Sequence, residues 1–275
     1  MTMKKLKKQA ILAFIFALIA LVVLSASTFA WFTFRAETNV TPMSGTISNG
    51  DGDLLISNNA AGPFDTSCEL LLADADAELL PLSTADLENF YAVSAQNTSG
   101  IATAYREAQE RAENNTLRGT VYLRAEGSGF DVYFWQPSIH CGNDDQALAA
   151  MRLGLKITTM SGTVSHIFRL DELGNTANAE SRITIPQPGC VVGSVDADGN
   201  AAYVEDGAID ISMCAAGGDQ DNVLPGNLAL CTLSDGEVAT VEFMLYLEGC
   251  DENCINSVQA RDIGLQFAFA GAQND

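Results

Sequence analysis

The chain has 275 residues and seven cysteines, and 35 acidic residues against 14 basic ones give it a formal charge of −21 at pH 7. A chain this acidic excludes nucleic acid as a partner, because that affinity comes from neutralising phosphates with Lys and Arg. The charge serves solubility, and the partners it permits are cations, basic proteins and further copies of the chain.

The first 30 residues have the parts of a secretion signal. Four lysines lie within the first eight residues, Ala10 to Leu24 is an uninterrupted apolar run, and small residues follow. Thr28 and Ala30 stand three and one residues before Trp31, where a signal peptidase accepts small side chains. We predict that residues 1–30 are a signal peptide, that a signal peptidase cuts before Trp31 during export, and that the mature protein is extracellular.

An uncut membrane anchor is the alternative for this segment. Few polar atoms occur between Ala10 and Phe34, and roughly 20 apolar residues suffice to cross a bilayer as a hydrophobic helix. The four lysines would then stay on the cytoplasmic side. The protein would remain at the cell surface, touching the membrane only through its N-terminal segment.

Most of residues 31–275 alternate between apolar and polar side chains, as half-buried strands do. The shorter candidates are residues 43–48, 53–57, 181–185 and 208–212. Hairpins are expected over residues 121–134, around Gly127-Ser128-Gly129, and over residues 153–170. The clearest alternation covers residues 241–248, and the last covers residues 263–269. This pattern predicts an all-β fold, an antiparallel β-sandwich of the jelly-roll type, in a single domain over residues 31–275.

One stretch near residues 84–115 departs from this alternation. Residues 84–93 and 101–115 are typical of helices, and the second segment is rich in Ala, Glu, Gln and Arg without Gly or Pro. We expect a short helical insertion on the sandwich, packed through Leu87, Phe90, Tyr91 and Tyr105.

The cysteines favour disulfides in an extracellular protein, with up to three bridges and one thiol left over. Cys250 and Cys254 are close enough in sequence for a disulfide that clamps a small loop. Pairing of either one with Cys214 or Cys231 is an open alternative. We assign these cysteines a structural role, since two thiolates alone do not form a metal site.

Motifs of catalysis are absent from the sequence, and we expect the protein not to be an enzyme. The two histidines are not spaced as His-Glu-x-x-His, and neither Gly-x-Ser-x-Gly nor a phosphate-binding loop occurs. His140 is expected in a loop without function. His166 shares its strand face with Val164 and Phe168, which predicts a core histidine with its hydrogen bonds satisfied.

Calcium is the one cofactor that the acidic loops suggest. Residues 196–200 read Asp-Ala-Asp-Gly-Asn, which superficially resembles the start of an EF-hand loop. The glycine falls at loop position four, however, and Gly207 occupies the twelfth position, where an EF-hand has Glu. We predict a tight Asp-Gly turn between strands. A Ca²⁺ site assembled from several loops stays open, without assigned ligands.

Four short segments resemble TasA/camelysin-type proteins of Gram-positive bacteria: residues 28–32, 43–47, 53–57 and 263–270. In that family a dedicated signal peptidase, of the SipW type, cuts just before an aromatic segment. The resemblance covers roughly the first 57 residues and the final ten. It implies a jelly-roll subunit of an extracellular biofilm-matrix fibre, in which the segment after the cut pairs as a strand with the next subunit.

The residues after Trp31 suit such a donor strand. In an extended segment Phe32, Phe34 and Ala36 lie on one side, and Thr33 and Arg35 on the other. The strand could fill a neighbour's groove with apolar side chains while its backbone completes a sheet edge. In the alternative reading, residues 31–40 are the chain's own first strand or the end of an uncut membrane helix.

Three hypotheses follow from the sequence. The first is a secreted, non-enzymatic subunit or accessory of an extracellular fibre that associates with itself through donor strands. The second is a membrane-tethered ectodomain that binds a ligand without polymerising. The third is a camelysin-like metallopeptidase.

Overall fold

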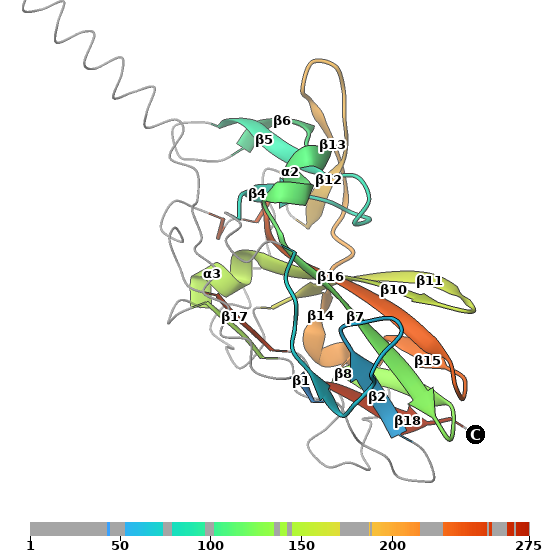
Figure 1. Ribbon diagram of the computed structural model, residues 1–275. Coiled ribbons are helices and arrows are strands. Elements are labelled where there is room, and N and C mark those ends of the chain that lie inside the picture. The colour runs from blue at the N-terminus through green and yellow to red at the C-terminus, as the bar shows by residue number, and fades with distance from the viewer. Residues whose placement is uncertain are drawn as a thin grey trace, which may run out of the picture.

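The computed structural model describes residues 43–44, 53–73, 79–96, 102–134, 138–141, 145–170, 187, 189–214, 228–251, 253–254, 263–266 and 268–274. These residues form strands, turns and a few short helical segments (Figure 1), which confirms the all-β class and the sandwich.

The larger layer of the sandwich is an antiparallel run of five strands. In spatial order these are β2 (Asp53–Ser57), β7 (Leu117–Glu126), β16 (Val238–Glu248), β10 (Met151–Thr159) and β11 (Gly162–Arg169). Two residues of β14 (Ile209–Asp210) add to the end of β11 in parallel, and a 3-10 helix (Ile211–Cys214) follows.

The smaller layer has three strands, with β8 (Phe130–Phe134) between β15 (Cys231–Leu233) and β18 (Phe269–Gln273). A separate pair, β9 (Ser138–Cys141) and β17 (Ile263–Gln266), joins the segments that follow β8 and precede β18. The short helix α3 (Asp145–Ala150) then leads into β10. At the opposite end of the chain β1 (Met43–Ser44) pairs with β3 (Ser67–Cys68).

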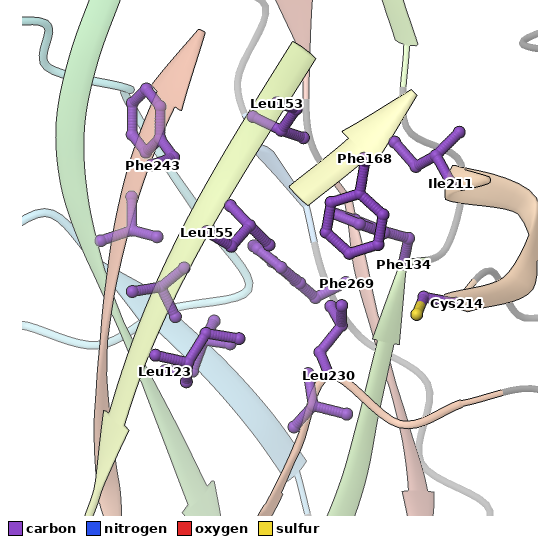
Figure 2. Packing of buried hydrophobic residues seen from close by; sticks show 14 of the residues in the cluster. Leu123, Phe134, Leu153, Leu155, Phe168, Ile211, Cys214, Leu230, Phe243 and Phe269 are labelled. Atoms are coloured by element: carbon purple, nitrogen blue, oxygen red, sulfur yellow. The ribbon is translucent and has the colours of Figure 1, made fainter. Parts of the chain in front are cut away.

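The core between the layers follows from side-chain alternation. On β16, Val241, Phe243 and Leu245 face inward and are almost fully buried. Figure 2 shows Phe134 of the smaller layer pointing toward Phe168 of the larger one, and their ring centroids lie 5.3 Å apart. Each such buried side chain contributes about 1.5–3 kcal/mol relative to exposure, which makes this cluster the main stabilising element.

A second unit, which we call the annex, covers one end of the larger sheet, at the top of Figure 1. It comprises β4 (Pro81–Ser83), β5 (Tyr91–Gln96), β6 (Ala102–Glu107), α2 (Gln109–Asn114) and the hairpin of β12 (Cys190–Val195) with β13 (Ala201–Glu205). The parallel pairing of β4 with the end of β16 joins it to the sandwich. Its apolar residues bury the outward side of β16 at Tyr246.

Several predicted elements are confirmed. Strand 53–57 has the predicted bounds, the strand over 241–248 is part of β16, and β10 and β11 form the hairpin expected over 153–170. The Asp-Gly turn at residues 196–200 joins β12 to β13.

The helical prediction for residues 84–115 is largely wrong. Residues 91–96 and 102–107 are paired strands, and of the residues described in this stretch only Gln109–Asn114 are helical. Tyr91, Val93 and Tyr105 are buried on this hairpin, so tertiary packing outweighs the helix preference of the Ala- and Glu-rich sequence.

Two strand predictions also need correction. Gly127 and Gly129 do not close a hairpin, because β7 pairs with β2 and β16 whereas β8 pairs with β15 and β18. The turn carries the chain from one layer to the other. The strand predicted over 263–269 is divided into β17 and β18, which pair with β9 and β8. Within residues 208–212, only 209 and 210 form a strand.

Candidate functional site

A buried arginine lies where the annex meets the sandwich. Arg152 is on β10, on the face opposite the apolar core, and is 1% exposed. Its neighbour across the sheet on β16 is Tyr246. A charged side chain on this face of a strand would ordinarily reach solvent, but the annex covers the sheet here.

Arg152 has partners on both terminal nitrogens. Its Nη1 donates to the carbonyl oxygens of Ala149 (2.8 Å) and Met151 (3.0 Å). Its Nη2 donates to Oδ2 of Asp251 at 2.8 Å and lies 3.9 Å from Oδ2 of Asp206. Burial alone would lower the pKa of Arg152, but the carboxylates of Asp251, Asp206 and Glu248 raise it above its usual range. The guanidinium is therefore permanently charged.

A third carboxyl group, that of Glu248, faces the same arginine from the end of β16. It accepts a hydrogen bond from the backbone N–H of Cys250 at 3.0 Å and another from the Ser83 hydroxyl. Burial raises the pKa of Glu248 to about 8, against the opposing influence of Arg152 and Ser83. Three carboxyl groups thus surround one cation, and burial favours the neutral form of Glu248.

The cluster continues into the annex through neutral polar groups. Ser83 Oγ accepts a hydrogen bond from the backbone N–H of Val192 on β12 at 3.1 Å. The Tyr105 hydroxyl on β6 lies 3.1 Å from Sγ of Cys250. We call the set the polar cluster: Ser83, Tyr105, Arg152, Asp206, Tyr246, Glu248, Cys250 and Asp251.

Two polar atoms of the cluster are buried without a hydrogen-bond partner among the described residues, Nε of Arg152 and the hydroxyl of Tyr246. Leaving such a group unsatisfied costs about 1–3 kcal/mol. Burial also raises the pKa of the Cys250 thiol to about 12, so it remains a neutral thiol rather than a nucleophilic thiolate. The arrangement suits holding elements together and not covalent chemistry.

A groove lies on the outer face of the larger sheet, with a volume of about 430 Å³. Gly154 forms part of its floor, where an added Cβ would lie 2.5 Å from Leu87. Lys156 Nζ donates to Glu88 at 3.1 Å, and Arg118 Nη2 donates to the carbonyl of Ala112 at 2.7 Å. The described lining residues include two acids, Glu113 and Glu242, beside these two bases. Because the acidic and basic side chains balance, the groove favours neither an anionic nor a cationic ligand.

The smaller layer offers a third candidate region, its sheet edges. Among the described residues both β15 and β18 pair only with β8. The two edges differ in how well the core residues beside them are buried. Near β18, Leu54 and Phe269 are buried, whereas on the β15 side Val164 is 38% exposed although its pairing partner Ile157 is fully buried.

The predicted processing and donor-strand residues lie outside the described residues. This applies to Thr28, Ala30, Trp31, Phe32, Phe34 and Ala36. Within the part of the chain that the structure describes, no helix is long and apolar enough to cross a membrane.

The structure does not contain the predicted disulfide between Cys250 and Cys254, and both residues are free thiols. Their surroundings explain this. Cys250 packs in the annex beside Tyr105, while Cys254 packs against the sandwich core. The alternative partners Cys214 and Cys231 are buried free thiols as well.

The histidines differ from each other. His166 is half-buried, stacks on Phe168, and its Nε2 lies 3.0 Å from the carbonyl oxygen of Leu230, which agrees with a satisfied packing role. His140 was expected in a loop but lies in β9, opposite Gly264.

The Asp196 turn uses its carboxylate internally. Oδ1 of Asp196 accepts the backbone N–H groups of Asp198 and Asn200, both at 2.9 Å. These hydrogen bonds, and those from the Asn200 side chain, lower the pKa of Asp196. In the described part of the chain no three His, Cys, Asp or Glu side chains are grouped so as to hold a metal ion.

Sequence reasoning missed the polar cluster. Glu248 ends an alternating strand and Arg152 stands between Met151 and Leu153, so both occupy positions that ordinarily face solvent. One signal was present, since the outward positions of β16 become apolar at Met244 and Tyr246 before Glu248.

Comparison with known proteins adds no relative. No family model matches the chain, and neither characterised proteins nor solved structures match it significantly. The resemblance of its two ends to TasA/camelysin-type proteins therefore stays a prediction.

Proposed function

We propose that this chain is an exported, non-enzymatic structural protein that joins copies of itself by strand addition into, or onto, an extracellular fibre. The observation that carries the proposal is the inequality of the two layers. Five strands face three, and within the described residues the outer strand β15 pairs with β8 alone. A free edge can accept a strand from another chain.

The β15 edge is the better acceptor. Val164 on β11 faces inward but remains exposed, and Leu228 and Met213, beside the start of β15, are also exposed. A strand added next to β15 would extend the smaller layer over Val164. The β18 edge has less to gain, because the core beside it is already closed.

The donor is the segment that follows the predicted cleavage site. Residues 31–42 could extend about 40 Å, far enough to leave their own subunit. Phe32 and Phe34 would face the neighbour's core, and each would gain about 1.5–3 kcal/mol on burial before the cost of ordering the segment.

The test compares purified proteins that begin at Trp31. The wild type should form high-mass assemblies in light scattering and fibres in electron micrographs, and so should a control with Thr33→Ser and Arg35→Gln on the opposite side of the strand. Phe32→Ser with Phe34→Ser should leave monomers. A wild type that stays monomeric at all concentrations would contradict the proposal, and so would a Phe double variant that assembles equally well.

The acceptor edge is tested separately with Val164→Glu. A charge there should block assembly without unfolding the subunit, since Val164 is at the margin of the core. A peptide of residues 31–42 should inhibit wild-type assembly in the same way. Assembly that is unaffected by both would place the acceptor at a different edge.

Two other functions would give different results. A membrane-tethered ectodomain would keep residues 1–30 and remain monomeric after detergent extraction. A camelysin-like peptidase would cleave casein in a chelator-sensitive manner.

A further inference from the structure

We propose that β6 carries a latent strand-pairing edge, and that the Asp196 turn (residues 196–200) covers this edge and keeps a second copy of the chain from pairing with it. The inference does not depend on strand addition at β15. It rests on the place of β6 in its sheet, on the contacts between the turn and β6, and on the hydrogen bonds that fix the turn.

β6 is the outermost strand of the sheet that β4 and β5 continue from β16 into the annex. Among the described residues its only ladder partner is β5. The N–H of Ala108 donates to the carbonyl of Phe90, toward β5, whereas the N–H of Tyr105 donates away from β5. Because the backbone groups of successive strand residues point to opposite edges, those of Glu107 also face outward. Backbone groups on such an edge can pair with a strand of another chain.

The Asp196 turn lies directly against this edge. The carbonyl oxygen of Gly199 accepts the outward N–H of Tyr105 at 3.1 Å. A Cβ added at Gly199 would lie 3.2 Å from the carbonyl oxygen of Tyr105 and 3.8 Å from Cβ of Ala104, so the backbone of the turn touches β6. The rings of Tyr105 and Tyr203 meet edge to face beside this contact, with centroids 6.3 Å apart. Both outward backbone groups of Tyr105 are thereby covered.

The sequence of the turn keeps this cover in one shape. Besides the hydrogen bonds to the Asp196 carboxylate, the N–H of Asp196 donates to the carbonyl of Asn200 at 3.0 Å, and the N–H of Gly199 donates to the carbonyl of Asp196 at 3.1 Å. Gly199 has a φ of +87°, a conformation that glycine adopts without the steric cost of a Cβ. The letters that resemble an EF-hand loop therefore specify a fixed turn whose residue without a side chain contacts β6.

The partner that fits an uncovered β6 edge is the β6 of a second copy. Two copies bring the same edge, so two antiparallel β6 strands can meet about a twofold axis without any other component. The exposed side chains of β6 are Thr103, Arg106 and Glu107. They include one base and one acid, so two such edges do not repel each other by net charge, although the whole chain has a charge of −21.

The experiment uses the mature chain with Phe32→Ser and Phe34→Ser as a background, so that strand addition by residues 31–42 does not contribute to association. Gly199→Val adds a branched side chain against β6. We expect exchange of the Tyr105 amide with deuterium to become about tenfold faster or more. Sedimentation should show a dimer that forms with rising concentration. The matched control is Gly236→Val, since Gly236 has a similar φ of +75° but no atom within 4 Å of an added Cβ. It should keep the size of the background and the slow exchange of Tyr105.

A second change identifies the edge that pairs. Adding Glu107→Pro to Gly199→Val removes an outward N–H from β6 and should return the protein to the size of the background. If Gly199→Val fails to fold, Asp196→Ala with Asn200→Ala loosens the turn instead and should give the same dimer. Unchanged exchange of Tyr105 in the folded turn variant would overturn the proposal. So would faster exchange without association, and so would a dimer that Glu107→Pro does not dissociate. These outcomes are the same whether or not the wild type forms fibres.

Discussion

The sandwich and the annex junction are stabilised by different physics, although both use the strand β10. Its inward residues Leu153, Leu155 and Ile157 join the apolar core between the layers. Its outward residue Arg152 is equally buried but contacts carboxylates. Apolar contacts depend little on pH and tolerate imperfect partners, whereas a buried ion cluster depends on every member being present and correctly protonated. The two faces of one strand therefore predict different responses to mutation and pH.

The largest effect should come from Arg152→Met. This change leaves the buried Asp251 and the partly buried Asp206 without Arg152, and breaking a buried pair in this way costs about 3–5 kcal/mol. Urea denaturation at pH 7 measures the loss. Lys156→Met, which removes an exposed ion pair with Glu88 from the same strand, should change stability by less than about 1 kcal/mol. Equal effects of the two substitutions would mean that burial gives Arg152 no special role.

Leu155→Ala should follow, with a loss of about 2–5 kcal/mol from the missing contacts and the cavity left in the core. Unlike the Arg152 variant, it should lose the same amount at pH 5 and at pH 9. A loss that varies strongly with pH would show that the two faces of β10 are not independent.

Glu248→Gln should change how the stability of the annex junction depends on pH. The pKa of Glu248 is raised from 4.5 to about 8 in the folded protein, so the unfolded chain releases this proton first. The stability that the neutral carboxyl provides is fully present below pH 4.5 and is lost as the pH rises through about 8. Relative to wild type, Glu248→Gln should therefore gain on the order of 1–3 kcal/mol between pH 5 and pH 9. Denaturation curves with parallel pH dependence for the two proteins would contradict this.

The smallest effects on stability should come from two buried tyrosines, of which one hydroxyl has a polar contact and the other has none among the described residues. Tyr105→Phe removes a hydroxyl that contacts Cys250 and should cost about 1 kcal/mol. Tyr246→Phe removes a hydroxyl that has no partner among the described residues, and should be neutral or stabilise by up to about 1 kcal/mol. Thermal unfolding of both variants at pH 7 measures these changes in stability. A larger loss of stability for Tyr246→Phe than for Tyr105→Phe would contradict the view that the Tyr246 hydroxyl lacks a partner.

The sandwich could be predicted from the sequence because alternation records which face of a strand is buried. Val241, Phe243 and Leu245 identified β16, and the Ser161-Gly162 turn identified the β10–β11 hairpin. Alternation does not record which strands pair. The sequence therefore predicts a hairpin at Gly127 and Gly129, although the turn there crosses between the layers.

The annex was harder to predict from the sequence for a related reason. Residues 102–107 have a helix-favouring composition, but Tyr105 is buried against β12 and β13, far away in the sequence. The same holds for the polar cluster, whose members come from residues 83 to 251. Each charge looked like an ordinary outward position, and only the covering annex turns Arg152 and Glu248 into buried groups.

We propose that export produces a subunit whose new N-terminus joins another copy. N-terminal sequencing combined with size analysis of the protein recovered from outside its native host tests this most directly. We expect a first residue of Trp31 in material of high mass. An intact lysine-rich N-terminus in the membrane fraction, at the mass of a single chain, would contradict it.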